Sequence, residues 1–362
     1  MCHEGAPPSC LGMKRRSGQL RAAAGEWREE YDRRANEFRD GAQSPQPRDF
    51  RGSVKPSGID FIVHKVAVSE LFWRQLRFQE FDVSEMSISS FLMIMAKGDK
   101  NWIGLPIFTT RHFFHTMAFA RKDSGINSPA DYKGKRVGVP EFQQTGALWA
   151  RGAMTHEFDC KQEDVEWWME RTPEHSHAGA VGFKPPQGTT LKQIPPDKSI
   201  GSMLLAGELD ATSLYFGNEV NIIDRTSVDL RRHPDIKPVF PDTLAECARY
   251  YEKTGIYPIN HAMIIRRSLV EKYPWAPMSI YHAMVAANET ANKERVEHMQ
   301  YYIETGLVPR AYASVITAPI VRHGLRANRK TLETCAQYSH EQGLTPRLMK
   351  MEELFAPSTL SE

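Results

Sequence analysis

The sequence predicts an α/β fold divided into two lobes, and two observations support this. Short apolar segments alternate with longer segments of helical periodicity along most of the chain, which is typical of sheets flanked by helices. The length of 362 residues is too great for one small hydrophobic core and suits two lobes with an appendage. We find no internal repeat.

The elements follow in chain order from Val54. Ile59, Phe61 and Val63 alternate with the residues between them, which predicts a half-buried strand. Further strands are predicted at 102–109, 116–121, 135–140 and 261–265, and residues 91–96 form a short buried segment. Helices are predicted at 69–81, 145–157, 278–295 and 331–342, and residues 207–211 lead from a helix end into a strand.

Four positions supply boundary signals for helices. Ser128 is a suitable N-cap for a short helix in which Pro129 is the first residue. The helix at 331–342 is expected to be capped by Thr331 and ended by Gly343.

Residues 1–50 are expected to be a variable N-terminal segment, because they are highly charged and end in a breaker-rich run at 41–47. Three basic residues at 14–16 are not followed by an apolar stretch, so we expect no secretory signal and a cytoplasmic location. We expect residues 51–116 and 234–362 to form lobe 1 with C-terminal helices, and residues 117–233 to form lobe 2.

Composition limits the classes of partner. The 46 basic and 44 acidic residues leave a formal charge of +2, which favours neither nucleic acid nor a membrane surface, so a small molecule is the expected partner. The longest apolar run, 91–96, is far too short to span a bilayer. Five dispersed cysteines without a CxxC pair indicate reduced thiols. The sequence leaves a homo-oligomer open.

The most informative local feature is the predicted strand–loop–helix at 137–146. A helix that begins near Thr145 directs its free N–H groups and positive dipole end at the crevice beyond the strand, where open α/β sheets bind ligands. With the Thr145 hydroxyl, this end suits a substrate carboxylate. Ordinary N-capping by Thr145 explains the same residues equally well.

Two other segments carry candidate binding groups. Arg111 could clamp a carboxylate and His115 could carry a proton, or Arg111 pairs with a surface acid and His115 is a core histidine. Residues 82–90 combine small hydroxyls with one acid. Within them Glu85 and Ser87 could bind phenolic hydroxyls, although a polar turn with a helix cap is the commoner meaning.

Later residues complete the candidate set. His261 opens a predicted strand, and Trp149 and Arg151 lie on the helix that begins at Thr145; a structural role remains the alternative for the histidine and the tryptophan. Residues 174–177 (Glu-His-Ser-His) resemble a metal site, but their proline- and glycine-rich surroundings indicate a mobile surface loop, so we expect no metal there. The chain has no P-loop, HExxH, GxGxxG or serine nucleophile elbow.

Taken together, several of these segments resemble the 4,5-dihydroxyphthalate decarboxylase family. The segments that carry the resemblance are residues 81–87, 111–115, 138–142, 149–152, 207–211, 258–261, 328–333, 338–344 and 353–357. It covers roughly Gly52 to Pro357, and the order and spacing of the segments make it specific. It implies a type 2 periplasmic-binding-protein-like fold, with two α/β lobes around a central cleft, and non-oxidative decarboxylation of a catecholic acid.

The chain departs from the family pattern at two places. The family's Tyr-Asp-Arg segment, here residues 31–33, lies in a charged context far from 52–56, so the first strand is expected to be altered or missing. Where the family has an aromatic Trp-Pro-Tyr-Gly segment, this chain has residues 318–324 without those aromatic residues. If that segment lines the pocket, the substrate differs from 4,5-dihydroxyphthalate.

The mechanism we expect avoids an aryl carbanion. A ring hydroxyl para or ortho to the carboxylate pushes electrons into the ring, the ipso carbon is protonated, and CO2 then leaves. Arg111 and the helix end at Thr145 would hold carboxylates, and His115 or His261 would donate the proton. Glu141 would orient a histidine or accept a phenolic hydrogen. No organic cofactor is expected, and a divalent metal remains open.

Two other functions stay open at this stage. The same cleft could serve a non-catalytic binding protein for a small aromatic or amino-acid-like anion. A relative of thiamine-precursor synthases would share the fold, but it would want a cysteine-rich iron-binding segment, which these scattered cysteines do not supply.

Overall fold

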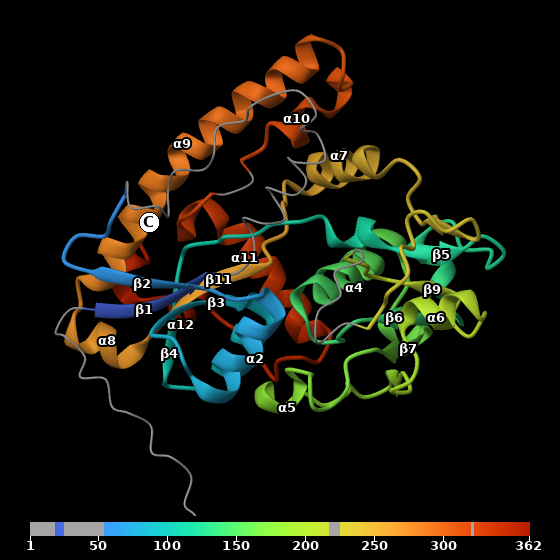
Figure 1. The fold of residues 1–362 in the computed structure, drawn as a ribbon, viewed down its shortest axis with the longest axis horizontal. Coiled ribbons are helices and arrows are strands. Elements are labelled where there is room, and N and C mark those ends of the chain that lie inside the picture. Colours follow the sequence, from blue (N-terminus) through green and yellow to red (C-terminus); the bar gives the residue numbers. More distant parts are fainter. Residues whose placement is uncertain (1–18, 25–53, 217–224, 320–321) are drawn as a thin grey trace, which may run out of the picture.

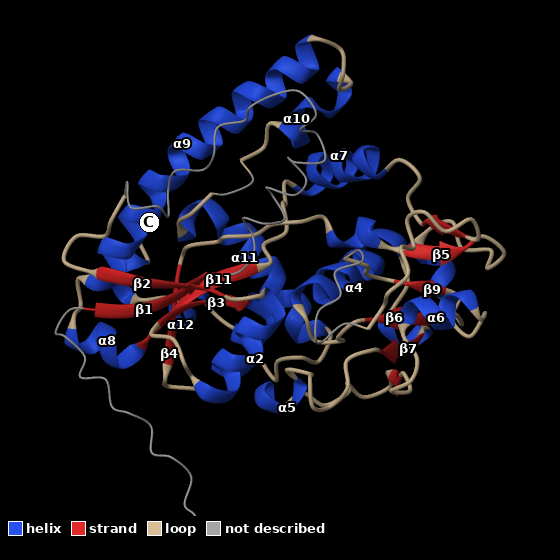
Figure 2. Ribbon diagram, in the orientation of Figure 1, coloured by secondary structure: helices blue, strands red, loops and turns tan. Residues whose placement is uncertain are grey.

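The computed structural model describes residues 19–24, 54–216, 225–319 and 322–362. The described strands form two separate sheets, which lie on the left and right of Figure 1 with helices around both. Figure 2 shows the same separation by element type. Tyr31, Asp32 and Arg33 lie outside the described residues. The proposed lobe boundaries stay a prediction.

The five-stranded sheet has the order β2-β1-β3-β11-β4. Its strands are β1 (Gln19–Ala24), β2 (Asp60–Lys65), β3 (Val83–Ser87), β4 (Trp102–Leu105) and β11 (His261–Arg266). The β1 strand pairs in parallel with β2 and β3, whereas β11 runs antiparallel to β3 and β4. This late strand therefore brings residue 261 beside the end of β3.

Strand β1 lies within residues 1–50, so a first strand is present where the departure from the family pattern predicted it to be altered or missing. All six of its residues are in register with β2, from Gln19 opposite Asp60 to Ala24 opposite Lys65. Its sequence, Gln-Leu-Arg-Ala-Ala-Ala, has low intrinsic preference for strand, so periodicity did not reveal it. Pairing with neighbours on both sides overrides that preference.

The six-stranded sheet has the order β10-β5-β9-β6-β7-β8. Its strands are β5 (Phe119–Arg121), β6 (Arg136–Val139), β7 (Glu166–Met169), β8 (Thr190–Gln193), β9 (Ala211–Thr212) and β10 (Ile236–Pro238). The four strands from β9 to β8 run parallel, and β5 pairs antiparallel with both β9 and β10.

Two connecting segments join the sheets and run side by side. Residues 106–118 lead from β4 to β5, and the return passes through residues 255–260 into β11. The segments pair antiparallel: the Asn260 N–H donates to the Thr110 carbonyl at 2.8 Å, and the His112 N–H donates to the Pro258 carbonyl at 3.1 Å. This pairing fixes the position of both connecting segments between the two sheets.

The helices pack around these sheets. They are α2 (Val68–Phe78), α3 (Ile88–Ala96), α4 (Thr145–Phe158), α5 (Ala178–Val181), α6 (Ile200–Leu205), α7 (Thr243–Thr254), α8 (Arg267–Lys272), α9 (Ala276–Glu304), α10 (Ala313–Ile316), α11 (Leu325–Glu341) and α12 (Met351–Leu354). The long helix α9 extends away from the five-stranded sheet toward the top of Figure 1. In the described ranges, no helix is both long and apolar enough to cross a bilayer.

Most predicted elements are confirmed, including the helix that starts at Thr145, the Pro129 helix start, and the strands near 60, 136 and 261. Two are corrected. Residues 82–90 are not a turn but strand β3 running into α3, and that helix contains the buried segment 91–96. Helix α11 begins at Leu325 after Gly324, so Thr331 lies buried inside it rather than capping it. Gly343, with φ of +70°, follows its end as expected.

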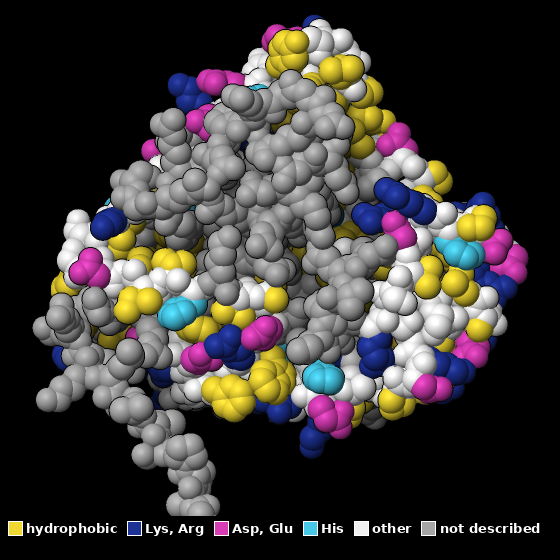
Figure 3. Space-filling model, in the orientation of Figure 1, with side chains coloured by type: hydrophobic (Ala, Val, Ile, Leu, Met, Phe, Trp, Pro, Cys, Tyr) yellow, Lys and Arg dark blue, Asp and Glu magenta, His cyan; other side chains and the backbone are white. Residues whose placement is uncertain are grey.

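The surface carries mixed charge. On the face drawn in Figure 3, basic and acidic side chains are interspersed rather than gathered by sign. This distribution fits the near-neutral composition.

Helix α4 of the six-stranded side packs directly against α11. A Cβ atom at Gly152 would overlap the ring of Tyr338, so these two helices approach as closely as glycine permits. Two further contacts join the same surfaces: the Gln342 amide donates to the Leu148 carbonyl at 2.9 Å, and His156 and Glu341 pair at 2.7 Å. The contact therefore ties α4 to the C-terminal helices.

We expect Gly152→Ala to lower the free energy of unfolding by about 1–3 kcal/mol, because the added methyl group must displace the Tyr338 ring. Guanidinium unfolding measures this. Gly179→Ala is the matched control, since its Cβ meets nothing within 4 Å. In a double-mutant cycle, Tyr338→Ala should remove most of the Gly152→Ala cost; full additivity would contradict the proposed overlap.

Candidate functional site

The two sheets meet where β3 ends and α4 begins, and hydroxyl side chains join them there. Ser87, the last residue of β3, hydrogen bonds through its hydroxyl to the Thr145 hydroxyl at 2.8 Å. The Ser89 N–H also donates to the Thr145 hydroxyl, at 3.2 Å, and the Ser89 hydroxyl donates to the Gln143 carbonyl at 2.7 Å. We call Glu85, Ser87, His261, Glu141, Gln143 and Thr145 the intersheet cluster.

The cluster contains a buried histidine and carboxylate on the five-stranded sheet. His261 is the cross-strand partner of Ser87, which directs both side chains to one face of the sheet. Its Nδ1 lies 3.6 Å from Glu85 Oε1, close enough for an ion pair but too long for a hydrogen bond. Glu85 is fully buried and accepts a hydrogen bond from the Thr109 hydroxyl.

A second buried carboxylate, Glu141, lies on the other side of the cluster. It accepts hydrogen bonds from Arg171 Nη1 at 2.6 Å, from the Ser176 hydroxyl at 2.7 Å, and from the His177 N–H at 2.7 Å. Gln143 Nε2 also donates to it. Burial alone would raise the pKa of Glu141, but the protonated form of His177, the charge of Arg171 and these hydrogen bonds outweigh it and hold the pKa below its ordinary value.

Three polar side-chain atoms around the cluster are buried without a hydrogen-bond partner. They are His261 Nδ1, Gln143 Oε1 and Gln144 Nε2. Such atoms are rare in native proteins, and each calls for an explanation such as a ligand or an ordered water. An imidazole, a hydrogen-bond acceptor and a hydrogen-bond donor at one junction can bind a ligand that carries both hydroxyl and carboxylate groups.

Sequence reasoning missed part of this site. Residues 174–177 were expected to be a mobile surface loop, but only Glu174 and His175 are exposed, whereas Ser176 and His177 are buried against Glu141. The reason is a contact across 35 and 36 positions of sequence, which local composition does not reveal. Within the ranges that the structure describes, no three His, Cys, Asp or Glu side chains gather as metal ligands.

Arg111 lies between backbone segments rather than beside an acid. Its guanidinium donates to the Tyr257 carbonyl at 3.0 Å, to the Arg322 carbonyl at 2.9 Å and to the Asn328 side chain. Burial lowers the pKa of Arg111 to about 10. In this arrangement it ties both connecting segments to the start of α11, and its role as a carboxylate clamp stays a prediction.

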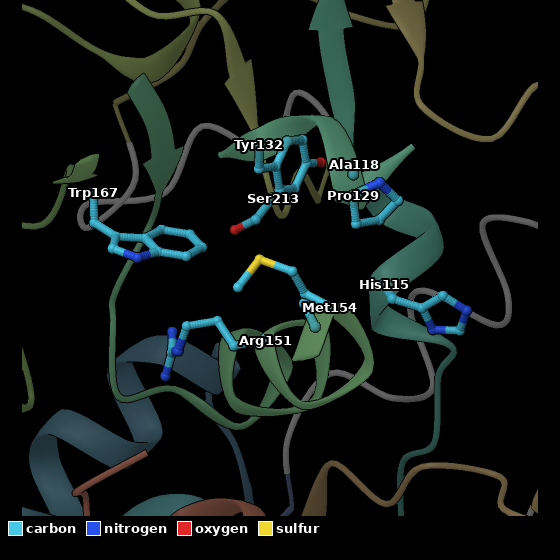
Figure 4. Close-up of a pocket in the computed structure, with 9 residues that line it drawn as sticks. His115, Ala118, Pro129, Tyr132, Arg151, Met154, Trp167 and Ser213 are labelled. Carbon is cyan, nitrogen blue, oxygen red and sulfur yellow. The ribbon is translucent and has the colours of Figure 1, made fainter. Parts of the chain in front are cut away.

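The structure does not bring His115 into the intersheet cluster. Its Nε2 lies 3.0 Å from Glu246 Oε1, and its ring packs against Tyr250 and Phe240. In Figure 4 the His115 ring is turned away from a small cavity in the six-stranded lobe. These surroundings match the core-histidine alternative, so of the two candidate proton donors only His261 lies in the cluster.

Trp149 and Arg151 extend from α4 into packed surroundings. Trp149 Nε1 donates to the Ile259 carbonyl at 2.9 Å, so the indole links α4 to the connecting segment at residues 255–260. Arg151 is buried, and its guanidinium stacks on Phe142 at 3.7 Å from the ring centroid. Burial lowers its pKa to about 9. The cavity that it lines with Trp167 (Figure 4) has a volume of about 10 Å³, the room that one water needs.

The architecture defines the class of protein. The periplasmic aliphatic sulphonate binding protein SsuA of Escherichia coli aligns with a TM-score of 0.52 and 11% identity over 94% of this chain and 92% of that one. The desulfurization enzyme DszB aligns with a TM-score of 0.51 and 15% identity over 95% and 98%. The chain therefore has the periplasmic-binding-protein-like fold that the resemblance implied.

Relatives in sequence identify the family. A 4,5-dihydroxyphthalate decarboxylase of Comamonas testosteroni is 30% identical over 314 residues, which cover 85% of this chain and 92% of the relative. A second, of Pseudomonas putida, is 36% identical over 160 residues, or 44% of this chain and 62% of the relative. No family model matches the chain. The chain belongs to the 4,5-dihydroxyphthalate decarboxylase family, which confirms the resemblance.

The lowered pKa of Glu141 predicts a pH-dependent contribution to stability. We expect Glu141→Gln to lower the free energy of unfolding by about 3–5 kcal/mol at pH 7, because it removes the buried carboxylate that pairs with the buried Arg171. The native carboxyl has a pKa below the ordinary 4.5, so this contribution is complete above pH 4.5 and is lost as the pH falls through the native value.

Guanidinium unfolding of wild type and Glu141→Gln between pH 7 and pH 3 tests this expectation. Glu174→Gln, which changes an exposed carboxylate of the neighbouring loop, is the control and should have little effect. A stability difference that stays constant below pH 4.5 would contradict an ionised Glu141 in the folded protein.

Proposed function

We propose that the chain catalyses the non-oxidative decarboxylation of a hydroxylated, phthalate-like aromatic acid at the intersheet cluster. Membership of the 4,5-dihydroxyphthalate decarboxylase family supports the reaction type. The observation that carries the choice of site is the buried His261, whose Nδ1 has no hydrogen-bond partner and lies 3.6 Å from the buried Glu85. Groups in such surroundings are typical of functional sites.

The reaction needs a proton at carbon. Direct loss of CO2 would leave an electron pair in the plane of the ring, where the π system does not stabilise it. A hydroxyl para or ortho to the carboxylate supplies electrons, so that the ipso carbon accepts a proton before the C–C bond breaks. The pair from that bond then restores aromaticity, and one proton replaces one CO2. These steps call on acid–base groups and anion-binding groups alone.

In this proposal His261 protonates the ipso carbon. Glu85 lies 3.6 Å from its Nδ1 on the same sheet. The Thr145 end of α4 attracts a substrate carboxylate through its N–H groups and dipole, which places the carbon that bears the carboxylate near His261. Ser87 is hydrogen bonded to Thr145 and completes the polar wall on the side of β3. Arg111, Trp149 and Arg151 support the walls through the backbone, packing and stacking contacts described above.

The same substitution, histidine to glutamine, at position 261 and at position 115 separates the two candidate proton donors. We expect His261→Gln to lower kcat for CO2 release about 10²–10⁴-fold, as is usual when a positioned general acid is lost. His115→Gln should instead lower the free energy of unfolding by about 1–3 kcal/mol, because Glu246 loses a buried partner, with little change in kcat.

The assay is CO2 release from 4,5-dihydroxyphthalate and a panel of hydroxylated phthalates and benzoates. If the wild-type protein releases CO2 from no member of the panel but binds one of them tightly, it is a binding protein instead. Full activity of His261→Gln would show that His261 is not the proton donor.

We also propose that the reaction proceeds without an organic cofactor, since the ring hydroxyl itself supplies the electron pair. Activity should therefore survive exhaustive dialysis. Assay of the same preparation after treatment with EDTA tests whether activity requires a divalent metal. We expect no such requirement. Loss of activity on chelation, with recovery on adding Mg²⁺ or Mn²⁺, would show that a metal takes part.

A further inference from the structure

The decarboxylation proposed above requires two proton transfers at different atoms of one ring. The hydroxyl oxygen must lose a proton as its electrons enter the ring, and the ipso carbon must gain one. When the hydroxyl is para to the departing carboxylate, these atoms lie at opposite ends of the ring. One imidazole fixed beside the carboxylate therefore serves the carbon and leaves the hydroxyl without a base.

We propose that His177 is the second proton-transfer residue and takes the proton of the ring hydroxyl. This inference rests on the proposed function. His177, the residue before α5, has its Nδ1 3.5 Å from Glu141 Oε2, which parallels the 3.6 Å between His261 Nδ1 and Glu85 Oε1. Each of two segments far apart in the sequence thus contributes one buried imidazole beside one buried carboxylate.

The two imidazoles share one aromatic neighbour. Both make edge-on contacts with Phe72 on α2, with ring centroids 6.1 Å away for His177 and 4.8 Å away for His261. The separation of the two histidine rings therefore cannot exceed the sum of those two distances, and the proposal requires that one aromatic substrate reach both.

The contacts of Glu141 favour a catalytic over a purely structural His177. The carboxylate already accepts hydrogen bonds from Arg171, Ser176 and the His177 backbone, so it does not need the imidazole to satisfy its oxygens. What Glu141 supplies to the ring is negative charge, which stabilises the imidazolium formed when His177 takes a proton.

The neighbouring glutamine indicates which end of the substrate lies here. Gln143 donates its amide N–H to Glu141, and its carbonyl oxygen is buried without a partner. That oxygen accepts hydrogen bonds only, so it suits a phenolic O–H and not a carboxylate. The hydroxyl end of the ring therefore belongs beside Glu141 and His177, and the carboxylate end beside Thr145 and His261.

The proton inventory balances. The O–H bond breaks with its proton passing to His177, and a C–H bond forms at the ipso carbon with a proton from the His261 imidazolium. The C–C bond to the carboxylate then breaks, CO2 leaves, and the electron pair returns to the ring. His177 returns its proton to the hydroxyl oxygen, and His261 regains one from solvent.

A substrate with a more acidic hydroxyl distinguishes a lost base from a lost structural contact. We expect His177→Gln to lower kcat/KM for 4,5-dihydroxyphthalate about 10²–10⁴-fold. With 3,6-difluoro-4,5-dihydroxyphthalate, whose hydroxyls ionise more readily, the ratio of wild-type to variant rate should shrink markedly. For His261→Gln the same ratio should not shrink, since fluorine does not assist protonation of carbon.

His175→Gln is the matched control, because His175 is an exposed histidine two positions away, and it should keep wild-type kcat/KM. His177→Asn provides a second variant if His177→Gln fails to fold: its loss should also shrink with the fluorinated substrate. Thermal unfolding monitors the fold of each variant.

The inference is overturned if folded His177→Gln keeps its activity, or if its loss is the same on both substrates. Either result leaves the proposed function standing. Absence of CO2 release by the wild-type protein from every substrate would instead overturn the proposed function.

Discussion

The hydrogen bonds between Ser87, Ser89 and the Thr145 hydroxyl are the constraint on which the site depends. They join the end of β3 to the first residue of α4, and so they help to set the distance between two sheets that also share one hydrophobic cluster. Because His261 is registered against Ser87, the same contact also fixes how far the imidazole lies from the N-terminus of α4. Small side chains are needed here, since larger ones would hold the sheets apart.

Burial of two carboxylates at this junction has an energetic consequence. A buried carboxylate loses hydration. Glu141 is compensated by Arg171, a hydroxyl and a backbone N–H, and Glu85 accepts a hydrogen bond from Thr109 and lies 3.6 Å from His261. The close α4–α11 packing at Gly152 and Tyr338 supplies rigidity around this junction.

Arg111 illustrates how a residue in a family segment can be placed for architecture. The sequence offered a carboxylate clamp or a surface ion pair, and the structure has a third arrangement in which the guanidinium satisfies backbone carbonyls of two distant segments. An arginine presents several donors in a fixed fork, so it can hold chain segments together where no single hydroxyl or amide could. The crossings between the sheets depend on this kind of support.

The sequence by itself determined the alternation of strands and helices, the start of α4 at Thr145, and the family, because these depend on local periodicity, capping chemistry and ordered motifs. It left His115 and His261 as equal candidates and assigned His177 to a surface loop. Only the tertiary structure decided among them: His261 reaches the junction through its register with β3, and His177 through a loop that folds back on Glu141. Both contacts join residues far apart along the chain, and local sequence patterns do not predict contacts between such residues.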